Sequence, residues 1–446
     1  MTLPVWKTAA PEFPSQLSAL LKRLSLEEGL RAAESRTGEA PEAVVRRIIE
    51  DVRRRGDAAL VEYARRFDGC RLTPETLRVS DQEVEAALER CPADLLTAIE
   101  LAAERIRRFQ EATLAREPKP VSDRGRLLRV RCRPVDSAGL CVPGAAASLA
   151  STVLMCAVPA KVAGVGRIAM VTPPAADGSV SDDRLAAARV AGVDEVYRIS
   201  GAQAVAALAY GTQSVPPVDF IAGPGNVYVA LAKKLVFGQV GIEALPGPSE
   251  VVVIADRTAD PSNLAADLIS QAEHDPGSSI LLSDDEGLLE QVRRAIEEQL
   301  AGLPRAEAAR DCLAAYGALI ACRSLAECVE LANRIAPEHL EVQTAEPERV
   351  AEDIRHAGAI FLGSWSPVAV GDYLAGPSHV LPTGRTARFS SGLSANDFLK
   401  RSSLIRYDRQ ALAEDASALA RLARAEGLEG HARSVEARLG RRAGDA

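Results

Sequence analysis

Short apolar runs of strand type alternate with helical segments over most of the chain, and this alternation constrains the fold more than any other feature. A first series, from Gly139, includes RIAMVTPP, EVYRIS and DFIAGPGN, separated by segments such as DDRLAAARVAG and GAQAVAALAYG. A second series, from Ser249, includes SEVVVIAD, SSILLSD, GALIACRS and AIFLG. Strands that alternate with helices form parallel sheets covered by helices. The sequence therefore predicts an α/β fold with two Rossmann-like parallel-sheet domains.

Helical patterns flank the two α/β series. Glu, Arg, Ala and Leu recur at helical spacing over about the first 125 residues, and the pattern returns to helix after Phe389. Residues 115–139, AREPKPVSDRGRLLRVRCRPVDSAG, are rich in turn formers and basic residues. We expect a structural boundary in this stretch.

Length and charge narrow the functional class. With 446 residues, of which 47% are hydrophobic, the chain can bury at least two cores. Its 61 acidic residues outnumber its 53 basic ones, which gives a net charge of −8. A negative protein repels phosphate backbones. We therefore expect no nucleic-acid partner.

The uncharged stretch from Ser137 to Ala160 is long enough to span a bilayer, but it contains Pro143, Gly144 and Pro159. A buried loop and helix explain it better than a membrane span, so we expect no membrane association. The first residues, MTLPVWKTAAPEF, lack the apolar core of a signal peptide. These features predict a cytoplasmic protein.

The eight cysteines are scattered without a C-x-x-C pair, which argues against a structural zinc site and a redox motif. Most should be buried in a reducing compartment.

Histidine is scarce, and four of the five histidines stand beside other potential ligands. Gln271 and His274 are spaced i and i+3 where a helix meets a Pro-Gly stop. Glu338 directly precedes His339, a carboxylate beside an imidazole on one short turn. The other two pairings are Asp372 with His379, in a glycine-containing loop, and Glu426 with His431. Together these side chains could form a mixed nitrogen and oxygen metal site, although each could also be an ordinary hydrogen-bonded residue.

Two glycine loops follow strands of the first α/β series. Gly201-Ala202-Gln203 follows VYRIS, and Gly223-Pro224-Gly225-Asn226 follows VDFI. Ligands of open α/β sheets bind where strands end and helices begin. The loops are therefore either phosphate-binding turns or plain tight turns. A literal G-x-G-x-x-A match at Gly164 precedes its strand, which is the wrong order for a dinucleotide site.

Several long motifs together resemble those of the histidinol dehydrogenases. They are, in chain order, GAQAVAALAYGT, FIAGPGNVYVALAK, GPSEVVVIAD, DLISQAEHDP, NRIAPEHLEV, GDYLAGPSHVLPTGRTARFSSGLS and AEGLEGHARSV. The resemblance implies an NAD-dependent oxidoreductase of histidine biosynthesis that converts L-histidinol through L-histidinal to L-histidine, with one Zn²⁺ per site. Two alternatives are a related zinc- and NAD-dependent dehydrogenase of another small polar alcohol and a catalytically silent metal-binding protein.

The resemblance also assigns roles to individual residues. It implies that Glu338 and His339 are catalytic, and that zinc is held by Gln271, His274, Asp372 and His431. These four residues, together with Ser249, His339, His379 and Glu426, match substrate-contacting positions. Gln203, Asn226 and Cys141 match positions that contact NAD. Cys141 stands where the family usually has a tyrosine, so it lacks the ring and hydroxyl that would contact the cofactor.

The family's architecture implies a division of the chain and an intertwined homodimer with shared active sites. Residues 1–35 would form an N-terminal helical dimerisation segment, and residues 36–122 with 247–390 a first α/β domain carrying most metal and catalytic residues. Residues 123–246 would form the NAD-binding α/β domain, and residues 391–446 a C-terminal helical tail. His431 and Glu426 lie in this tail, so the resemblance predicts that they complete the partner's site.

Overall fold

The structure, a computed structural model, describes residues 3–144, 149–245, 247–273, 277–303 and 306–440. It divides into two units. The first unit comprises Met1–Thr113 and Val135–Phe398, and the second comprises Leu114–Pro134 and Leu399–Ala446. The chain thus passes between units within the stretch where we expected a boundary.

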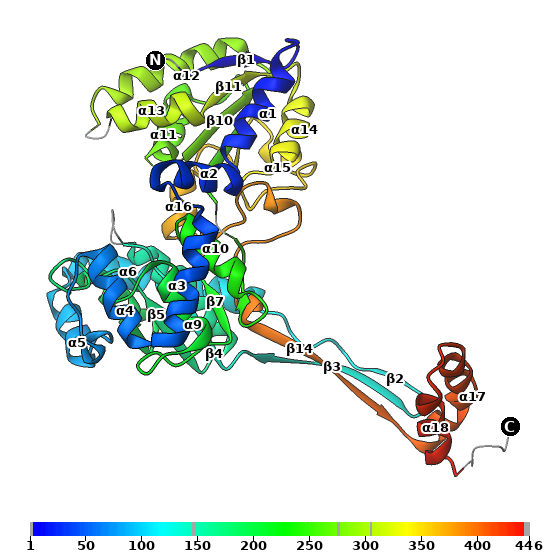
Figure 1. Cartoon of the computed structure of the whole chain (residues 1–446). Helices are drawn as coiled ribbons and strands as arrows, with labels where there is room; N and C mark the ends of the chain where they lie inside the picture. The colour runs from blue at the N-terminus through cyan, green and yellow to red at the C-terminus, as the bar shows by residue number, and fades with distance from the viewer. Residues whose placement is uncertain (1–2, 145–148, 246, 274–276, 304–305, 441–446) are drawn as a thin grey trace. The chain divides into compact units, whose positions relative to one another are not determined.

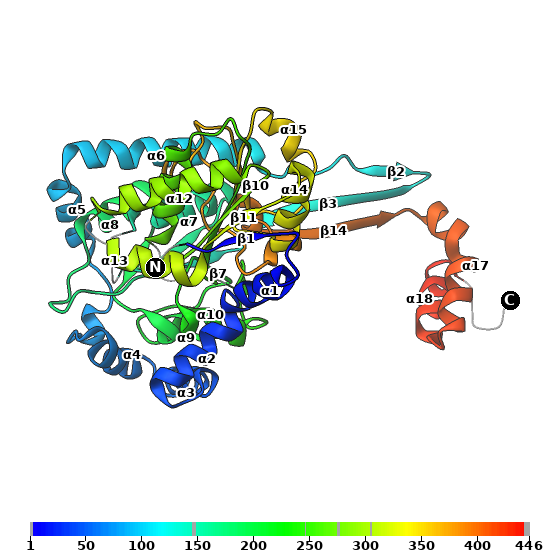
Figure 2. The same ribbon diagram turned by 90° about the horizontal axis from the view of Figure 1, so that it is seen from above.

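Within the described residues, the first unit contains two parallel sheets (Figures 1 and 2). Sheet A has the order β1-β11-β10-β9-β12-β13. Its strands are β1 (Val5–Lys7), β9 (Ser249–Ala255), β10 (Gly277–Ser283), β11 (Ala318–Ala321), β12 (His339–Gln343) and β13 (Ala359–Leu362). Sheet B has the order β6-β5-β4-β7-β8. Its strands are β4 (Ser137–Cys141), β5 (Arg167–Val171), β6 (Glu195–Tyr197), β7 (Phe220–Ala222) and β8 (Gly241–Ile242). The predicted α/β class is confirmed.

Sheet A is buried on both faces because successive residues of its strands are apolar. Val251 and Val253 of β9 pack in one core, and Val252 and Ile254 pack in the opposite core. Figure 1 shows helices along both faces of the sheet. The helices of this region are α1 (Phe13–Arg23), α2 (Leu26–Thr37), α11 (Pro261–Ala272), α12 (Glu286–Leu300), α13 (Ala306–Tyr316), α14 (Leu325–Ile335), α15 (Pro347–Ala351) and α16 (Val368–Tyr373).

Sheet B carries helices on two sides as well. On one side α7 and α8 pack against α5 and α6, and on the other α9 and α10 pack against α3. Their bounds are α3 (Pro41–Arg55), α4 (Asp57–Tyr63), α5 (Asp81–Arg90), α6 (Ala93–Thr113), α7 (Ala150–Ala163), α8 (Asp182–Ala191), α9 (Gly201–Tyr210) and α10 (Val227–Val236). Helix α7 is buried almost all round, as expected for the uncharged stretch. In the described part of the chain, no helix has the length and apolar character needed to cross a membrane.

The division of the chain differs from the expected one in two places. The helices of residues 36–122 pack on sheet B instead of joining the segment after residue 247. The N-terminal segment is part of sheet A, because β1 pairs with β11 and α1 packs in its core. The periodicity of a helix shows which face is apolar but not which sheet that face covers, so the sequence could not decide either point.

The second unit is a ribbon followed by two helices. Strands β3 (Arg126–Pro134) and β14 (Leu399–Tyr407) pair antiparallel along their whole length, and β2 (Val121–Asp123) pairs with β3. Helices α17 (Arg409–Ala425) and α18 (Glu429–Arg438) pack through Ala420, Ala423 and Ala432. The region after residue 391 is therefore not wholly helical. Most of β14 is exposed, including Ile405 at 71%.

Candidate active site

The amino ends of β9 and β12 bring together the expected acid and base. Helix α14 ends before Ala336, which adopts a left-handed conformation with φ of 51°, and the chain then turns into β12. A non-glycine residue in this conformation costs energy and is often found at functional sites. We expected His339 on a short turn, but it is the first residue of β12, beside Val251 of β9. The strand was missed because its run of five residues is interrupted by charged and polar side chains.

The carboxyl group of Glu338 is held at one oxygen. Ser249 Oγ donates to Glu338 Oε2 at 2.6 Å, and the backbone N–H of Glu250 donates to the same oxygen at 2.9 Å. The side chain of Glu338 is buried. Both bonds fall on Oε2, so Oε1 is the oxygen that neither of them engages.

The imidazole of His339 is oriented by the backbone of β9. Its Nδ1 lies 3.1 Å from the carbonyl oxygen of Glu250. A carbonyl oxygen only accepts, so Nδ1 carries the hydrogen and the neutral ring presents Nε2 as a base. Nε2 is buried, has no hydrogen-bond partner among the described residues and lies 3.9 Å from Asp372 Oδ1. Glu338 Oε2 lies 3.5 Å from Nδ1.

Glu250 is a site residue that the sequence analysis missed. Its backbone N–H and C=O hold Glu338 and His339, while its own carboxyl is buried and accepts from Gly384 N at 3.3 Å. Burial, followed by the charge of Glu338, raises the pKa of Glu250 to about 8. It is therefore largely neutral at pH 7, which avoids two adjacent buried negative charges. The signal in the sequence was an acid at the start of the otherwise apolar run SEVVVIAD.

Two of the four expected metal ligands lie in the described part of the first unit. Gln271 is buried in the last turn of α11, and within the described part of the chain its Nε2 has no hydrogen-bond partner. Asp372 lies in α16, next to His339. His274 lies outside the described residues, beyond the end of α11 at Ala272. Among the described residues, no three His, Cys, Asp or Glu side chains gather as a metal cluster.

The donor set nevertheless suits zinc. Gln271 is buried, and its amide oxygen is the atom that would ligate a metal. Gln271 and Asp372 would supply oxygens, and His274 and His431 would supply nitrogens, a combination typical of borderline divalent metals. Glu426 and His431 belong to the second unit, where both are exposed near the turn between α17 and α18.

The loop of residues 378–384 joins the helices of sheet B to the residues of sheet A. His379 Nε2 lies 3.2 Å from Thr152 Oγ1 of α7, and Ser378 Oγ donates to the carbonyl of Met155. At the other end of the loop, Thr383 Oγ1 accepts from Gly247 N at 2.7 Å. This loop places His379, an expected substrate contact, between the two α/β layers of the first unit.

The expected cofactor residues lie at the carboxyl ends of sheet B. Gln203 is buried in the first turn of α9, after Gly201, whose φ is +66°. Asn226 precedes α10, and its Oδ1 accepts from Tyr228 N and Val229 N. The amide nitrogen of Asn226 is then the group available to a ligand. Cys141 ends β4 with only 6% exposure, and burial raises the pKa of its thiol to about 12.

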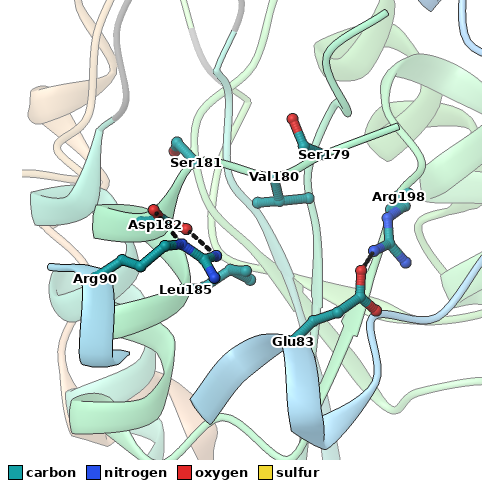
Figure 3. A pocket seen from close by; sticks show the side chains of 8 residues that line it. All are labelled: Glu83, Arg90, Ser179, Val180, Ser181, Asp182, Leu185 and Arg198. Atoms are coloured by element: carbon teal, nitrogen blue, oxygen red, sulfur yellow. Dashed lines mark hydrogen bonds and ion pairs between the residues drawn. The ribbon is translucent and has the colours of Figure 1, made fainter. Parts of the chain in front are cut away.

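A separate pocket of about 340 Å³ lies between α5 and α8 (Figure 3). Figure 3 shows that both of its arginines point at carboxylates. Arg90 forms an ion pair with Asp182 at 2.6 Å, and Arg198 forms one with Glu83. None of the expected site residues lines it. Because its cations are paired within the protein, we interpret it as a structural junction between helices.

Comparisons with known proteins agree with these observations. The family model described as histidinol dehydrogenase matches residues 31–439. The chain is 52% identical over 398 residues to histidinol dehydrogenase of a Synechococcus species, covering 89% of this chain and 92% of that protein. It is 50% identical over 432 residues to that of Ruegeria pomeroyi, covering 97% of each.

The fold comparison covers nearly the whole chain. The crystal structure of histidinol dehydrogenase from Elizabethkingia anophelis matches with a TM-score of 0.90 and 33% identity, over 98% of both chains. The likeness thus extends over both α/β sheets. By family model, sequence identity and fold, the chain belongs to the histidinol dehydrogenase family.

Proposed function

We propose that this protein oxidises L-histidinol through L-histidinal to L-histidine in histidine biosynthesis, with reduction of two NAD molecules. The observation that carries the proposal is the pair of proton acceptors at the amino end of sheet A. His339 Nε2 is buried and has no hydrogen-bond partner in the part of the chain that the structure describes, and the adjacent Glu338 keeps Oε1 outside its two hydrogen bonds. The two oxidations and the hydration between them each release a proton, and these two side chains can accept it.

In the first oxidation, the hydroxyl proton passes to His339 Nε2 as the carbinol carbon loses hydride. The backbone carbonyl of Glu250 keeps the ring in the tautomer that can accept this proton. Gln203 and Asn226 would hold NAD, which would accept the hydride in both oxidations.

In the second stage, Glu338 Oε1 accepts a proton from the water that adds to the aldehyde. The bonds from Ser249 and Glu250 fix the other oxygen, so Oε1 points in a defined direction. His339 releases its first proton to solvent; the hydrate then loses the second hydride, and His339 takes the hydroxyl proton. Zinc held by Gln271, His274, Asp372 and His431 would supply positive charge and orient the substrate nitrogens.

The direct test of the reaction is stoichiometry. Purified protein is incubated with zinc, NAD and limiting L-histidinol, and NADH, histidine and free histidinal are counted. We expect two NADH and one histidine per histidinol, with little free aldehyde. Turnover of another amino alcohol without turnover of histidinol would instead support a related dehydrogenase.

We further propose that the active unit is a homodimer in which the partner's tail completes each site. The second unit supports this proposal because it has little core of its own. Its helices share only three buried alanines in the described core cluster, while Ile405 and Leu422 are largely exposed. A two-stranded ribbon needs a further surface to be stable.

Subunit mixing tests the shared site. His274→Ala and His431→Ala chains, each inactive alone, are mixed and refolded together. If the tail serves the partner, about a quarter of the activity returns, because half the dimers are mixed and each has one intact site. Wild-type chains refolded in the same way are the control. Activity that stays absent in the mixture while the control recovers would show that the tail closes its own site.

We place this reaction in the cytoplasm. All eight cysteines are free, and seven of them are buried. Free thiols persist in a reducing compartment.

A further inference from the structure

A buried ion pair lies beneath the Gly223–Asn226 turn of sheet B. Lys233 is 0% exposed and the Glu243 side chain 6%, and their Nζ and Oε1 atoms are 2.6 Å apart. Lys233 Nζ also donates to the carbonyl of Gly223 at 3.1 Å. The N–H of Gly223 donates to Glu243 Oε1 at 2.7 Å. The pair therefore holds both backbone polar groups of one glycine.

This glycine occupies a tightly constrained position. Its φ of +112° is disfavoured for other residues, and a Cβ there would lie 2.2 Å from the carbonyl oxygen of Cys141. Asn226, three residues later, begins α10 and caps it with Oδ1. The shape of the whole turn, including the direction of the Asn226 side chain, thus depends on how Gly223 is held.

Stability alone does not explain the pair. Removing a lysine and a glutamate from water costs free energy that their attraction only partly returns, and an apolar pair of similar volume is often as stable. The pair does provide fixed directions for two backbone groups. A geometric role therefore explains the arrangement better than a contribution to folding.

We propose that Lys233 and Glu243 are positioning residues for NAD, which hold the Gly223–Asn226 turn in the shape that receives the dinucleotide. They act through the backbone of Gly223 and do not themselves contact the cofactor. The proposal rests on the proposed function, because it assumes that this turn binds NAD.

The test replaces the pair by an apolar one, Lys233→Met with Glu243→Leu. We expect the KM for NAD, and the Kd for NAD measured by calorimetry, to rise about tenfold, as for a displaced binding group. The kcat and the KM for histidinol should change little, because the acid and base lie on sheet A. Glu243→Gln keeps an oxygen for the Gly223 N–H, so it should raise the KM for NAD by a smaller factor.

Glu195→Gln is the matched control. Glu195 pairs with Arg167 at 2.9 Å at the start of β5 and β6, the opposite end of the same sheet. We expect this variant to lose stability without a change in NAD affinity. A folded double variant that binds NAD as wild type does would overturn the proposal, and so would an equal loss of affinity in Glu195→Gln.

If the double variant does not fold, a wild-type NAD affinity in Glu243→Gln would also overturn the proposal. Calorimetry also separates this proposal from the proposed function. If the wild-type protein binds NAD but does not oxidise histidinol, the proposed function is contradicted. The positioning role can still be tested then, because the Kd for NAD can be compared between wild type and the variants.

Discussion

Apart from β1 at the edge of sheet A, sheets A and B have the same strand order but present opposite ends to their functional residues. In both, the first strand is flanked by the second and the fourth, as the orders β11-β10-β9-β12-β13 and β6-β5-β4-β7-β8 show. On sheet B, Gln203 and Asn226 follow β6 and β7, and Cys141 is the last residue of β4, so all three lie at the carboxyl ends of the strands. On sheet A, Ser249 and His339 are the first residues of β9 and β12, so they lie at the amino ends of the strands.

The difference has a chemical reason. At the amino end of β9, the N–H and C=O of Glu250 both point at side chains, one at Glu338 and one at His339. At the carboxyl ends of sheet B, glycine turns expose backbone and helix amino ends to a ligand. We therefore expect changes on sheet A to lower kcat and changes on sheet B to alter NAD binding or local packing.

The largest effect should come from His339→Ala. It removes the proton acceptor of both oxidations, so kcat with histidinol and with histidinal should each fall by about 10²–10⁴-fold. NAD affinity, measured by calorimetry, should stay near that of wild type. His356→Ala, which removes a histidine from the loop before β13, is the control and should keep full activity. A large loss of NAD affinity in His339→Ala would break the division between the two sheets.

A smaller effect is expected for Cys141→Tyr on sheet B. The sequence alone suggests that restoring the family's tyrosine tightens NAD binding. Cys141 is buried, however, and packs in the core of sheet B, so a ring at this position must displace its neighbours. We expect the free energy of unfolding in urea to fall by about 1–3 kcal/mol, with no gain in NAD affinity. A lower KM for NAD at unchanged stability would show that the pocket has room for the ring.

The smallest effect concerns pH and a buried acid pair on sheet A. Gln343 Nε2 bridges Glu341 and Asp267, at 2.7 and 2.9 Å. Burial, followed by the charge of Asp267, raises the pKa of Glu341 to about 8 from its ordinary 4.5. The folded state therefore holds this proton more tightly than the unfolded state does.

The bound proton of Glu341 adds to the free energy of unfolding, and this contribution is full below pH 4.5 and is lost as pH rises through about 8. Glu341→Gln cannot ionise, so its Tm should fall less than that of wild type between pH 5 and 9. Thermal unfolding at a series of pH values measures this slope. If the Tm of wild type and of Glu341→Gln changes equally with pH, Glu341 ionises equally in the folded and unfolded states.

Sequence reasoning succeeded where local pattern decides structure. The apolar runs of β5, β9, β10 and β11 predicted their strands, and the glycine loops after β6 and β7 predicted where sheet B ends. It failed for β12, because its charged and polar residues hide a strand buried on both faces. It also missed β14 and β3, whose pairing joins segments more than 250 residues apart.

The site could be predicted only in part, because sequence patterns reveal neighbouring residues but not contacts between distant ones. The Glu338 and His339 pair is adjacent in sequence and could be recognised there. The roles of Glu250, Lys233 and Glu243 depend on hydrogen bonds to backbone groups that only the folded chain brings close. The rule that ligands lie at carboxyl ends finds the loops of sheet B and gives no reason to search the amino ends of sheet A.

The central claim is that His339 accepts the proton in both oxidations, whereas Glu338 serves the hydration between them. A single-turnover, rapid-quench measurement on Glu338→Gln with histidinol and excess NAD tests it most directly. The first hydride should appear at close to the wild-type rate, followed by a second phase slowed by about 10²-fold or more while aldehyde accumulates. Equal slowing of both hydride transfers, with no aldehyde, would contradict the separate roles of Glu338 and His339.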